Sequence, residues 1–388
     1  MYDQFHGQLN QVLTGAVFQD LTSENELVKY RALWVYGQCS RVPMEDDHRL
    51  EVGKLLFQLM NDENTAVKIT ASPSLYKNLR NNSMREAFKS ELPSILEAYL
   101  GLMDTIDNEE LIAGLEEVVS LYGDCIGPYA IELCWKIVEN FNKITGKEQE
   151  EEEHGTMGMA TSELVVTIRS FINSCKGDPE TLLQLEPGIF PVVVRSLSAD
   201  GCECLDEAMD CITATLNFTQ SVTERMWTLF PHLIKISNCW GPEDEEGGYA
   251  FDYFTSMEDY FRSLIKYGRD GMLTKKIGTD PVMILLIKGI IKILQLIKEK
   301  DVNINAYICI VIVETLLLEF PGKLDQLLPA FIKILCTELS NKEITKEFRL
   351  HTLTLVAHCF IYNCTLALGA LADLKVLVPV CQNFFSYL

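Results

Sequence analysis

Apolar residues recur along most of this chain at the three- and four-residue spacing of an α-helix. They fall into blocks of roughly 15 to 20 residues, separated by short polar or Pro- and Gly-containing breaks, and strand-like alternation is almost absent. The pattern therefore predicts an all-α fold. The predicted helices span residues 2–19, 25–39, 47–60, 66–79, 84–101, 108–121, 129–142, 162–175, 189–197, 205–218, 222–236, 251–267, 281–298, 304–320, 322–339, 346–362 and 374–385.

Pairs of these helices recur at intervals of roughly 40 to 45 residues, which is the interval of HEAT and armadillo repeats, and about nine pairs fit. One helix pair cannot bury its apolar face alone, so neighbouring pairs stack into a superhelix whose faces become binding surfaces. Residues 1–388 are therefore predicted to form one HEAT/armadillo-like helical-repeat solenoid.

Three residues bear on the helix boundaries. Ser162 precedes an apolar run and is expected to cap its helix, and Pro281 suits a first helical turn, where the N–H is not needed. Pro73 falls inside the predicted helix 66–79, where it removes a hydrogen-bond donor. We expect this helix to be split.

Two acidic insertions interrupt the helical pattern, near residues 145–157 and 241–248. Each has too much like charge to pack and is predicted to be a mobile loop between helices. Their acidic residues are Glu148, Glu150, Glu151, Glu152 and Glu153 in the first, and Glu243, Asp244, Glu245 and Glu246 in the second.

The amino-acid composition and the net charge limit the kinds of partner that the chain is expected to bind. Hydrophobic residues make up 48% of the chain, enough for an ordered protein. The formal net charge of −22 repels phosphate backbones and anionic lipids, so direct nucleic-acid binding is not expected. The same field favours basic partners, although acidity also serves solubility alone.

The thirteen cysteines are scattered through apolar helical sequence, which indicates reduced thiols, and residues 1–15 show no signal-peptide pattern. The apolar segments 282–297 and 306–318 are interrupted by Lys288, Lys292 and Glu314 and are too short to span a bilayer. We therefore expect a cytoplasmic or nuclear protein without membrane insertion.

No convergent catalytic motif occurs in the sequence. Cys202 and Cys204 form only a CxC, no two His stand four residues apart, and no phosphate-binding glycine motif or nucleophile elbow occurs. A DDxxD metal motif of helical cyclases is also absent. We expect neither an enzyme nor a cofactor.

Aromatic residues have two interpretations, core packing or partner binding. The cluster Tyr249, Phe251, Tyr253, Phe254, Tyr260 and Phe261 is interpreted as the core of one helix pair. Trp34, Trp135 and Trp227 lie in apolar helical sequence and are predicted to be core, whereas Trp240 borders the second acidic insertion.

The two acidic insertions are the candidate binding site. Beside a helical surface, such loops would attract Lys- and Arg-rich segments, with each exposed ion pair worth at most ~1 kcal/mol and many acting together. A purely solubilising role stays open for both.

Several segments of the chain are similar, in the same order, to one protein family. Tyr30-Arg31-Ala32-Leu33-Trp34-Val35 is similar to an Arg-Ala-x-x-Trp-Val helix, and Phe251-Asp252-Tyr253-Phe254-Thr255 to a Phe-Asp-Tyr-Phe-Thr run. Segments 66–71, 115–122 with 128–133, and 349–363 follow the same order. The family they resemble is the importin seven and importin eight subfamily of β-karyopherins, in its middle-to-late HEAT region.

This resemblance implies nuclear import of basic protein cargo, such as ribosomal proteins and histones, with release by Ran-GTP and passage through nucleoporins, in nucleus and cytoplasm. The amino-terminal importin-β domain has no counterpart in the sequence, so the resemblance also suggests a fragment. The alternative is a generic HEAT-repeat scaffold of a multiprotein complex.

Overall fold

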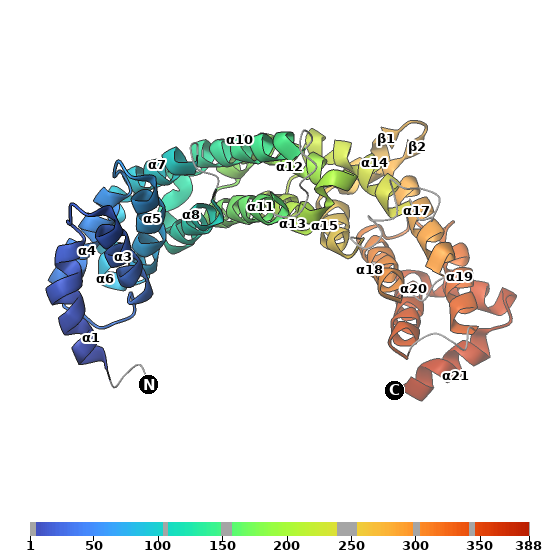
Figure 1. Cartoon of the computed structure of the whole chain (residues 1–388). Helices are drawn as coiled ribbons and strands as arrows, with labels where there is room; N and C mark the ends of the chain where they lie inside the picture. The colour runs from blue at the N-terminus through green and yellow to red at the C-terminus, as the bar shows by residue number, and fades with distance from the viewer. Residues whose placement is uncertain are drawn as a thin grey trace. The chain divides into compact units, whose positions relative to one another are not determined.

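The computed structural model describes residues 5–103, 108–148, 157–238, 254–297, 303–340 and 346–387. The chain divides into two compact units, unit 1 (Met1–Val192) and unit 2 (Val193–Leu388). Both units are built from stacked helices, as predicted (Figure 1).

Unit 1 contains two rows of helices. Row 1 consists of α3, α5, α8 and α11, and row 2 consists of α1–α2, α4, α6–α7 and α9–α10. Within row 1, each helix packs on the next one. Each row 1 helix also packs on the row 2 helix that precedes it in the chain. The helices are α1 (His6–Val12), η2 (Leu13–Val17), α2 (Phe18–Asp20), α3 (Glu26–Gln38), α4 (Asp46–Leu59), α5 (Thr65–Leu79), α6 (Asn82–Ala87), η3 (Lys89–Glu91), α7 (Leu92–Met103), α8 (Glu109–Leu121), α9 (Gly123–Ile126), η4 (Gly127–Tyr129), α10 (Ala130–Glu148), α11 (Met157–Ser174) and α12 (Pro179–Ser196), which contains the unit boundary.

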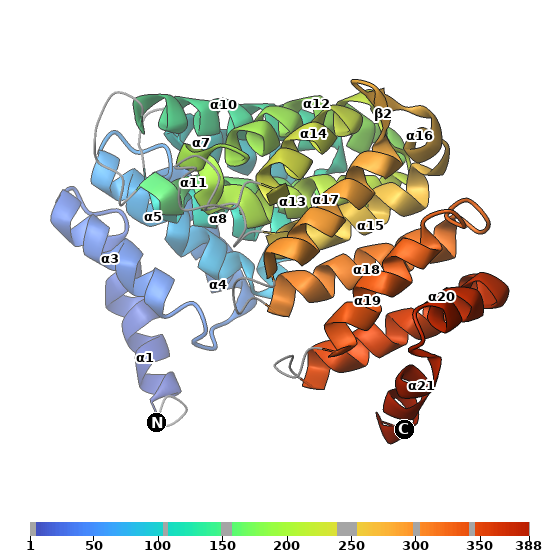
Figure 2. The ribbon, with the colours of Figure 1, turned by 90° about the vertical axis from the view of Figure 1, so that its right-hand side faces the viewer.

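Unit 2 repeats the arrangement, with α13, α15, α18 and α20 in row 1 and α14, α16–α17 and α19 in row 2 (Figure 2). Tyr260 Oη donates to the Met226 carbonyl at 2.9 Å and ties α15 to α14. The elements are η5 (Ala199–Cys204), α13 (Leu205–Thr219), α14 (Glu224–Asn238), η7 (Phe254–Met257), α15 (Glu258–Tyr267), α16 (Arg269–Thr274), β1 (Lys276–Ile277), β2 (Asp280–Pro281), α17 (Val282–Ile297), α18 (Asn303–Glu319), α19 (Leu328–Ser340), α20 (Lys346–Asp373) and α21 (Leu377–Tyr387).

The repeat interval follows from where the row 1 helices begin. They start at residues 26, 65, 109 and 157 in unit 1 and at 205, 258, 303 and 346 in unit 2, so intervals of roughly 40 to 50 residues recur. The longest intervals contain the two acidic insertions. The predicted HEAT-repeat period is confirmed.

Close contacts between neighbouring repeats fix the stacking in unit 1. The Ser74 hydroxyl of α5 donates to the Leu33 carbonyl of α3 at 2.8 Å. Gly37 lets the two helices approach, because a Cβ there would lie 2.7 Å from the Ser74 Oγ. A side chain at position 37 would push the two repeats apart.

Helix α5 corrects the prediction of a split at Pro73, because it runs unbroken from Thr65 to Leu79. The residues around Pro73 are buried, and the Ser74 hydroxyl also donates to the Thr70 carbonyl at 2.8 Å. One turn later, Asn78 Nδ2 donates to the Ser74 carbonyl at 2.8 Å. Packing and side-chain hydrogen bonds hold this helix together despite the missing Pro73 donor.

Two predicted helix starts are also corrected. Helix α11 begins at Met157, so Ser162 lies inside it and is not its N-cap. Pro281 ends a two-stranded antiparallel hairpin, in which Lys276 pairs with Pro281, and α17 begins one residue later. Gly278 in the hairpin turn has a φ of +62°, which glycine adopts without strain.

Helix α20 is the one helix in the described part of the chain whose segment, Phe348–Asp373, is long and apolar enough to cross a membrane. The backbone at Asn363 is not helical, with φ −154° and ψ 92°, so α20 consists of two shorter pieces. Each piece is shorter than the ~20 residues that span a bilayer. α20 packs on α18 and α19.

The tryptophans divide between core and surface. Trp227 is buried, as predicted, whereas Trp34 and Trp135 are 46% and 47% exposed. The prediction of a core position for these two was wrong, because the helical spacing around them does not show which face of the helix the neighbouring repeat covers. Phe254, Tyr260 and Phe261 are buried, and Tyr249, Phe251, Tyr253 and Trp240 lie outside the described residues.

Candidate functional site

The predicted acidic insertions lie almost wholly outside the described residues. Glu148 is the last residue of α10, and nothing is described of its side chain. Glu150 to Glu153 and Glu243 to Glu246 lie in the stretches 149–156 and 239–253, which are not described. Their role as a cargo patch stays a prediction.

The described helices nevertheless show which turns contain the insertions. The first joins α10 to α11, and the second joins α14 to η7 and α15. Each therefore leads from a row 2 helix into the row 1 helix that follows it. The same kind of turn occurs three times earlier in unit 1, before α3, α5 and α8.

These earlier turns are acidic as well. The carboxylates whose side chains are described there include Glu24, Glu26, Asp62, Glu63 and Glu110, which together we call the acidic edge. All are exposed except Asp62, which is half-buried. The row 1 helices pack side by side in the same direction, so their amino-terminal ends share one edge of unit 1.

Each of these three helices begins with an asparagine cap. Asn25 accepts from the Leu27 N–H, Asn64 from the Ala66 and Val67 N–H groups, and Asn108 from the Glu110 N–H. The caps satisfy backbone donors that have no partner inside the helix. Acidic residues in the first turn also stabilise the helix dipole, so part of the acidity has a structural role.

The sequence contains a signal for this edge that helical periodicity alone does not reveal. Residues 23–29 read Ser-Glu-Asn-Glu-Leu-Val-Lys, and residues 62–68 read Asp-Glu-Asn-Thr-Ala-Val-Lys. Both segments place a cap asparagine after an acidic residue and a lysine four positions later. This similarity between two segments of one chain, at the repeat interval, marks both turns.

The first two turns are linked by charge. Lys29 Nζ lies 2.9 Å from Asp62 Oδ2, and Asn64 donates to the Glu26 carboxylate. Partial burial would raise the pKa of Asp62, but the Asn64 N–H and the Lys29 ammonium together lower this pKa. Glu24, Glu63 and Glu110 remain as exposed charges that a cationic segment can reach.

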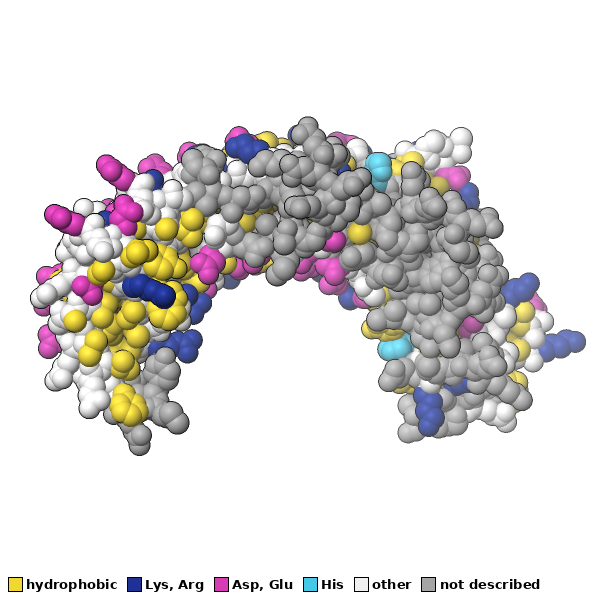
Figure 3. Space-filling view, in the orientation of Figure 1, with side chains coloured by type: hydrophobic (Ala, Val, Ile, Leu, Met, Phe, Trp, Pro, Cys, Tyr) yellow, Lys and Arg dark blue, Asp and Glu magenta, His cyan; other side chains and the backbone are white. Residues whose placement is uncertain are grey.

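Hydrophobic side chains also gather on this part of unit 1. Figure 3 shows them over its first helices, in the region of α1, α3 and α5. Leu27 and Trp34 lie seven residues apart on one face of α3 and are both exposed, and the Arg31 guanidinium lies 6.0 Å from the Trp34 ring. An exposed apolar face thus runs along α3 from Leu27 to Trp34, and exposed carboxylates lie at the start of the helix.

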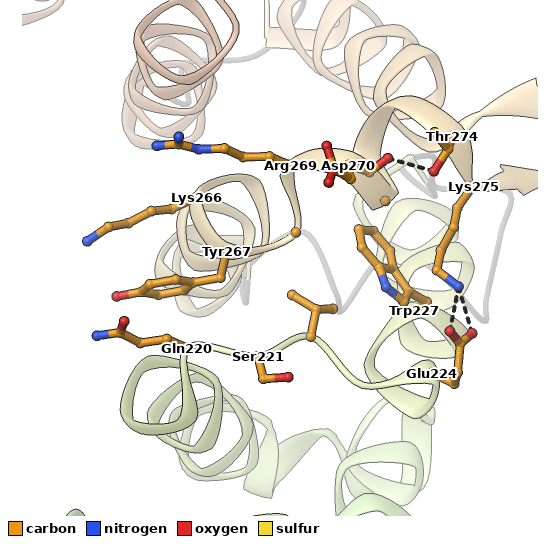
Figure 4. Close-up of a pocket in the computed structure, with 13 residues that line it drawn as sticks. Gln220, Ser221, Glu224, Trp227, Lys266, Tyr267, Arg269, Asp270, Thr274 and Lys275 are labelled. Atoms are coloured by element: carbon orange, nitrogen blue, oxygen red, sulfur yellow. Dashed lines mark hydrogen bonds and ion pairs between the residues drawn. The ribbon is translucent and has the colours of Figure 1, made fainter.

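Unit 2 contains a groove of about 600 Å³, which we call the unit 2 groove (Figure 4). It lies between the loop that joins α13 to α14 and the region where α15 passes into α16. Its lining residues are Gln220, Ser221, Val222, Glu224, Trp227, Lys266, Tyr267, Gly268, Arg269, Asp270, Gly271, Thr274 and Lys275.

The centre of the groove is built around Trp227. A Cβ at Gly271 would lie 2.3 Å from this ring and one at Gly268 would lie 2.8 Å from it, so only glycine allows the turn to pack here. Lys275 Nζ lies 5.8 Å from the centre of the same ring and 2.7 Å from Glu224 Oε2. The indole is held in place on both sides.

The described residues contain no group of three or more His, Cys, Asp or Glu side chains that could hold a metal ion. Burial raises the pKa of the Cys134 thiol to about 12 and that of Cys175 to about 11. Both thiols therefore stay protonated near neutral pH and are weak nucleophiles.

Comparison with solved structures defines the class of fold. The chain superimposes on yeast importin-β (Kap95p) with a TM-score of 0.55 over 99% of this chain and 44% of that protein, at 13% sequence identity. The fold is therefore that of the HEAT-repeat importin-β solenoids. No protein-family model matches the chain.

Sequence comparison gives the more particular relationship. The chain is 24% identical over 399 residues to a probable importin-7 homolog of Dictyostelium discoideum, covering 98% of this chain and 35% of the relative. It is 21% identical over 376 residues to human importin-8, covering 96% and 34%. The chain thus resembles importin-7 and importin-8 homologues along nearly its whole length, and it spans about a third of theirs.

Proposed function

We propose that this chain functions in a nuclear transport receptor, as the helical-repeat part that binds basic protein cargo. The observation that supports this most directly is the similarity to importin-7 and importin-8 homologues across 98% and 96% of the chain. The same proposal extends to the whole receptor of which this chain would form a part. It includes cargo release by Ran-GTP, binding to nucleoporins and shuttling between nucleus and cytoplasm.

The acidic edge supports the choice of basic cargo. Successive turns of unit 1 present carboxylates at the same end of α3, α5 and α8, and the sequence adds the acidic run Glu150–Glu153 to the next turn of the same kind. A flexible Lys-rich segment could contact several turns at once. Exposed ion pairs contribute at most about 1 kcal/mol each, so affinity would come from their number and would fall with salt.

The test is a pull-down of a Lys-rich histone tail on the full chain at low and moderate salt. One variant replaces Glu150, Glu151, Glu152 and Glu153 by Ser, and a second replaces Glu24, Glu63 and Glu110 by Ser. We expect salt-sensitive binding that each variant weakens by about fivefold or more, since several exposed pairs are lost.

The matched control removes four exposed carboxylates of row 2, through Glu86→Ser, Glu91→Ser, Glu97→Ser and Glu132→Ser, and should bind almost as the parent does. Equal loss in this control would mean that only net charge matters. No binding of the parent, or binding that salt does not change, would favour the alternative of a scaffold with fixed partners.

A further inference from the structure

Helix α12 contains helix-breaking residues close to the boundary between the two units, which falls after Val192. Among the described helices, α12 is the one with two prolines in its interior, Pro187 and Pro191, and Gly188 lies between them. Proline is the least favourable residue in a helix interior, and glycine is the next. The segment 187–191 is therefore the part of α12 whose helical conformation is least stable by itself.

The two prolines remove hydrogen bonds from successive turns of the helix. Pro187 has no N–H for the Leu183 carbonyl, and Pro191 has none for the Pro187 carbonyl. Residues four positions apart lie on the same face of a helix, so both missing bonds weaken the same side. Leu183 and Pro191 are exposed, so water can reach this side when the helix bends.

Helix α5 shows how the loss of a proline donor can be compensated. Pro73 is buried, and the Ser74 hydroxyl and the Asn78 amide bond carbonyls of the same helix. Residues 182–194 of α12 contain no serine, threonine or asparagine, the residues that commonly make such local bonds. The proline segment of α12 therefore lacks the side-chain bonds that hold α5 together.

The part of α12 that precedes Pro191 is anchored in unit 1. Asp178 accepts from the Thr181 N–H at 3.2 Å and from the Thr181 hydroxyl at 2.6 Å, which holds the first turn in place. The Trp135 ring of α10 lies against Gly188, where an added Cβ would be 3.7 Å from the ring. Leu182 is fully buried.

The part of α12 that follows Pro191 is anchored in unit 2. The Ser198 hydroxyl and N–H donate to the Arg195 carbonyl at 2.6 Å and 3.0 Å. Gly201 lies so close that an added Cβ would be 2.4 Å from the same carbonyl oxygen, and Ser196 is fully buried. Each end of α12 is thus fixed to a different unit, and the proline segment lies between the two anchors.

We propose that residues 187–191 form a joint at which α12 bends, so that unit 1 and unit 2 change their orientation while both stay folded. Each end of α12 moves with the unit that anchors it. The Trp135 ring limits the motion, because it must leave the Gly188 backbone when the helix bends. The joint is a property of α12 and does not depend on the proposed surface for basic cargo.

Hydrogen exchange followed by mass spectrometry on the full chain measures how often α12 opens. We expect amides 188–194 to exchange at least about tenfold faster than the buried amides of α11 and α13. Replacing both Pro187 and Pro191 by Ala restores the two donors and should slow this exchange about tenfold or more, because alanine is the best helix former. Pro231→Ala, in the interior of α14 within unit 2, is the matched control and should leave α12 unchanged.

Two tryptophans of equal exposure give a second comparison. Trp135→Ala should speed the exchange of α12 by about threefold, because it removes the apolar ring that covers Gly188. Trp34→Ala, at the exposed tryptophan of α3, is the control and should hardly change the exchange of α12.

Energy transfer between one dye in each unit measures the motion itself. The dyes are attached to non-natural residues that replace two exposed lysines, Lys89 of η3 and Lys333 of α19. We expect a broad distribution of dye-to-dye distances in the parent, which the double proline variant narrows and Pro231→Ala does not. Circular dichroism checks that the variants fold, and Pro191→Ala alone, at an exposed position, repeats the comparison if the double variant does not.

Three outcomes would overturn the proposal. The first is exchange of α12 in the parent that is as slow as that of α13, and the second is a double proline variant that exchanges like the parent. The third is slower exchange of α12 without a narrower distance distribution, because the helix would then open without moving the units.

Discussion

At the scale of single residues, polar groups join neighbouring repeats at defined points. Lys29 of α3 reaches Asp62 in the turn before α5, and Asp62 also accepts the Asn64 N–H at 2.9 Å. The two charged side chains are only 18% and 15% exposed, so solvent screens them less than an open surface pair. This carboxylate should therefore contribute to stability.

Replacing Asp62 by Asn should test this pair, because the amide oxygen can still accept from Asn64. The folded-state pKa of Asp62 is lowered, so its contribution is present above the unfolded pKa and is lost as the pH falls through the folded pKa. We expect Asp62→Asn to lower the free energy of unfolding by about 1 kcal/mol at pH 7 and by less at pH 3, which lies below the ordinary aspartate pKa of about 4.

Urea unfolding of parent and variant at both pH values measures the difference. Glu97→Gln, which removes an exposed carboxylate of α7, is the control and should have little effect at either pH. An Asp62→Asn penalty that is the same at pH 3 and pH 7 would show that the charge of Asp62 is not the cause.

At the scale of the element, helix-to-helix distance is set by small residues. Gly37 faces Ser74 across the α3–α5 contact, and the Ser74 hydroxyl is fixed by bonds to the Leu33 and Thr70 carbonyls. Ser74 therefore cannot turn away from an added methyl group. In α7, by contrast, nothing lies within 4 Å of a Cβ added at Gly101.

These two glycines allow a matched comparison. Gly37→Ala should destabilise the protein by about 1 to 3 kcal/mol because it overpacks a close contact. Gly101→Ala should stabilise it by about 0.5 to 1 kcal/mol, since alanine restricts the unfolded chain and favours helix. Chemical denaturation followed by circular dichroism gives both values, and stabilisation by Gly37→Ala would contradict the packing that we describe.

At the scale of the whole molecule, the main property is the large negative net charge, which belongs to the chain as a whole and not to any single contact. The chain has 55 acidic and 33 basic side chains. Much of this excess lies on exposed turns and helix faces, where like charges repel one another and oppose the compact state. Partners with basic segments would relieve this repulsion.

Screening should relieve it as well. Raising sodium chloride from about 20 to about 200 mM should increase the thermal midpoint by a few degrees, because the screening length falls from about 20 Å to below 10 Å. Differential scanning fluorimetry with potassium chloride as a second salt separates ionic strength from the kind of ion. A midpoint that falls with salt would mean that attractive ion pairs outweigh the repulsion.

The sequence alone determined the class of fold, the approximate repeat interval and the resemblance to importins. Helical periodicity and turn residues are local properties, so they can be recognised in the sequence without knowing which segments pack together. The same local information located several helices, such as α8 and α18, to within one residue of the structure. It also indicated that the acidic residues gather between helices.

Tertiary structure decided which face of each helix is covered by a neighbouring element and which face is exposed to solvent. Trp34, Trp135 and Trp227 have similar apolar surroundings in sequence, yet of these three only Trp227 is buried, where the turn that contains Gly268 and Gly271 packs closely on its ring. Pro73 stays within a continuous helix because α3 packs against it. The unit 2 groove likewise joins residues about 50 positions apart, and periodicity does not predict contacts between residues so far apart in the chain.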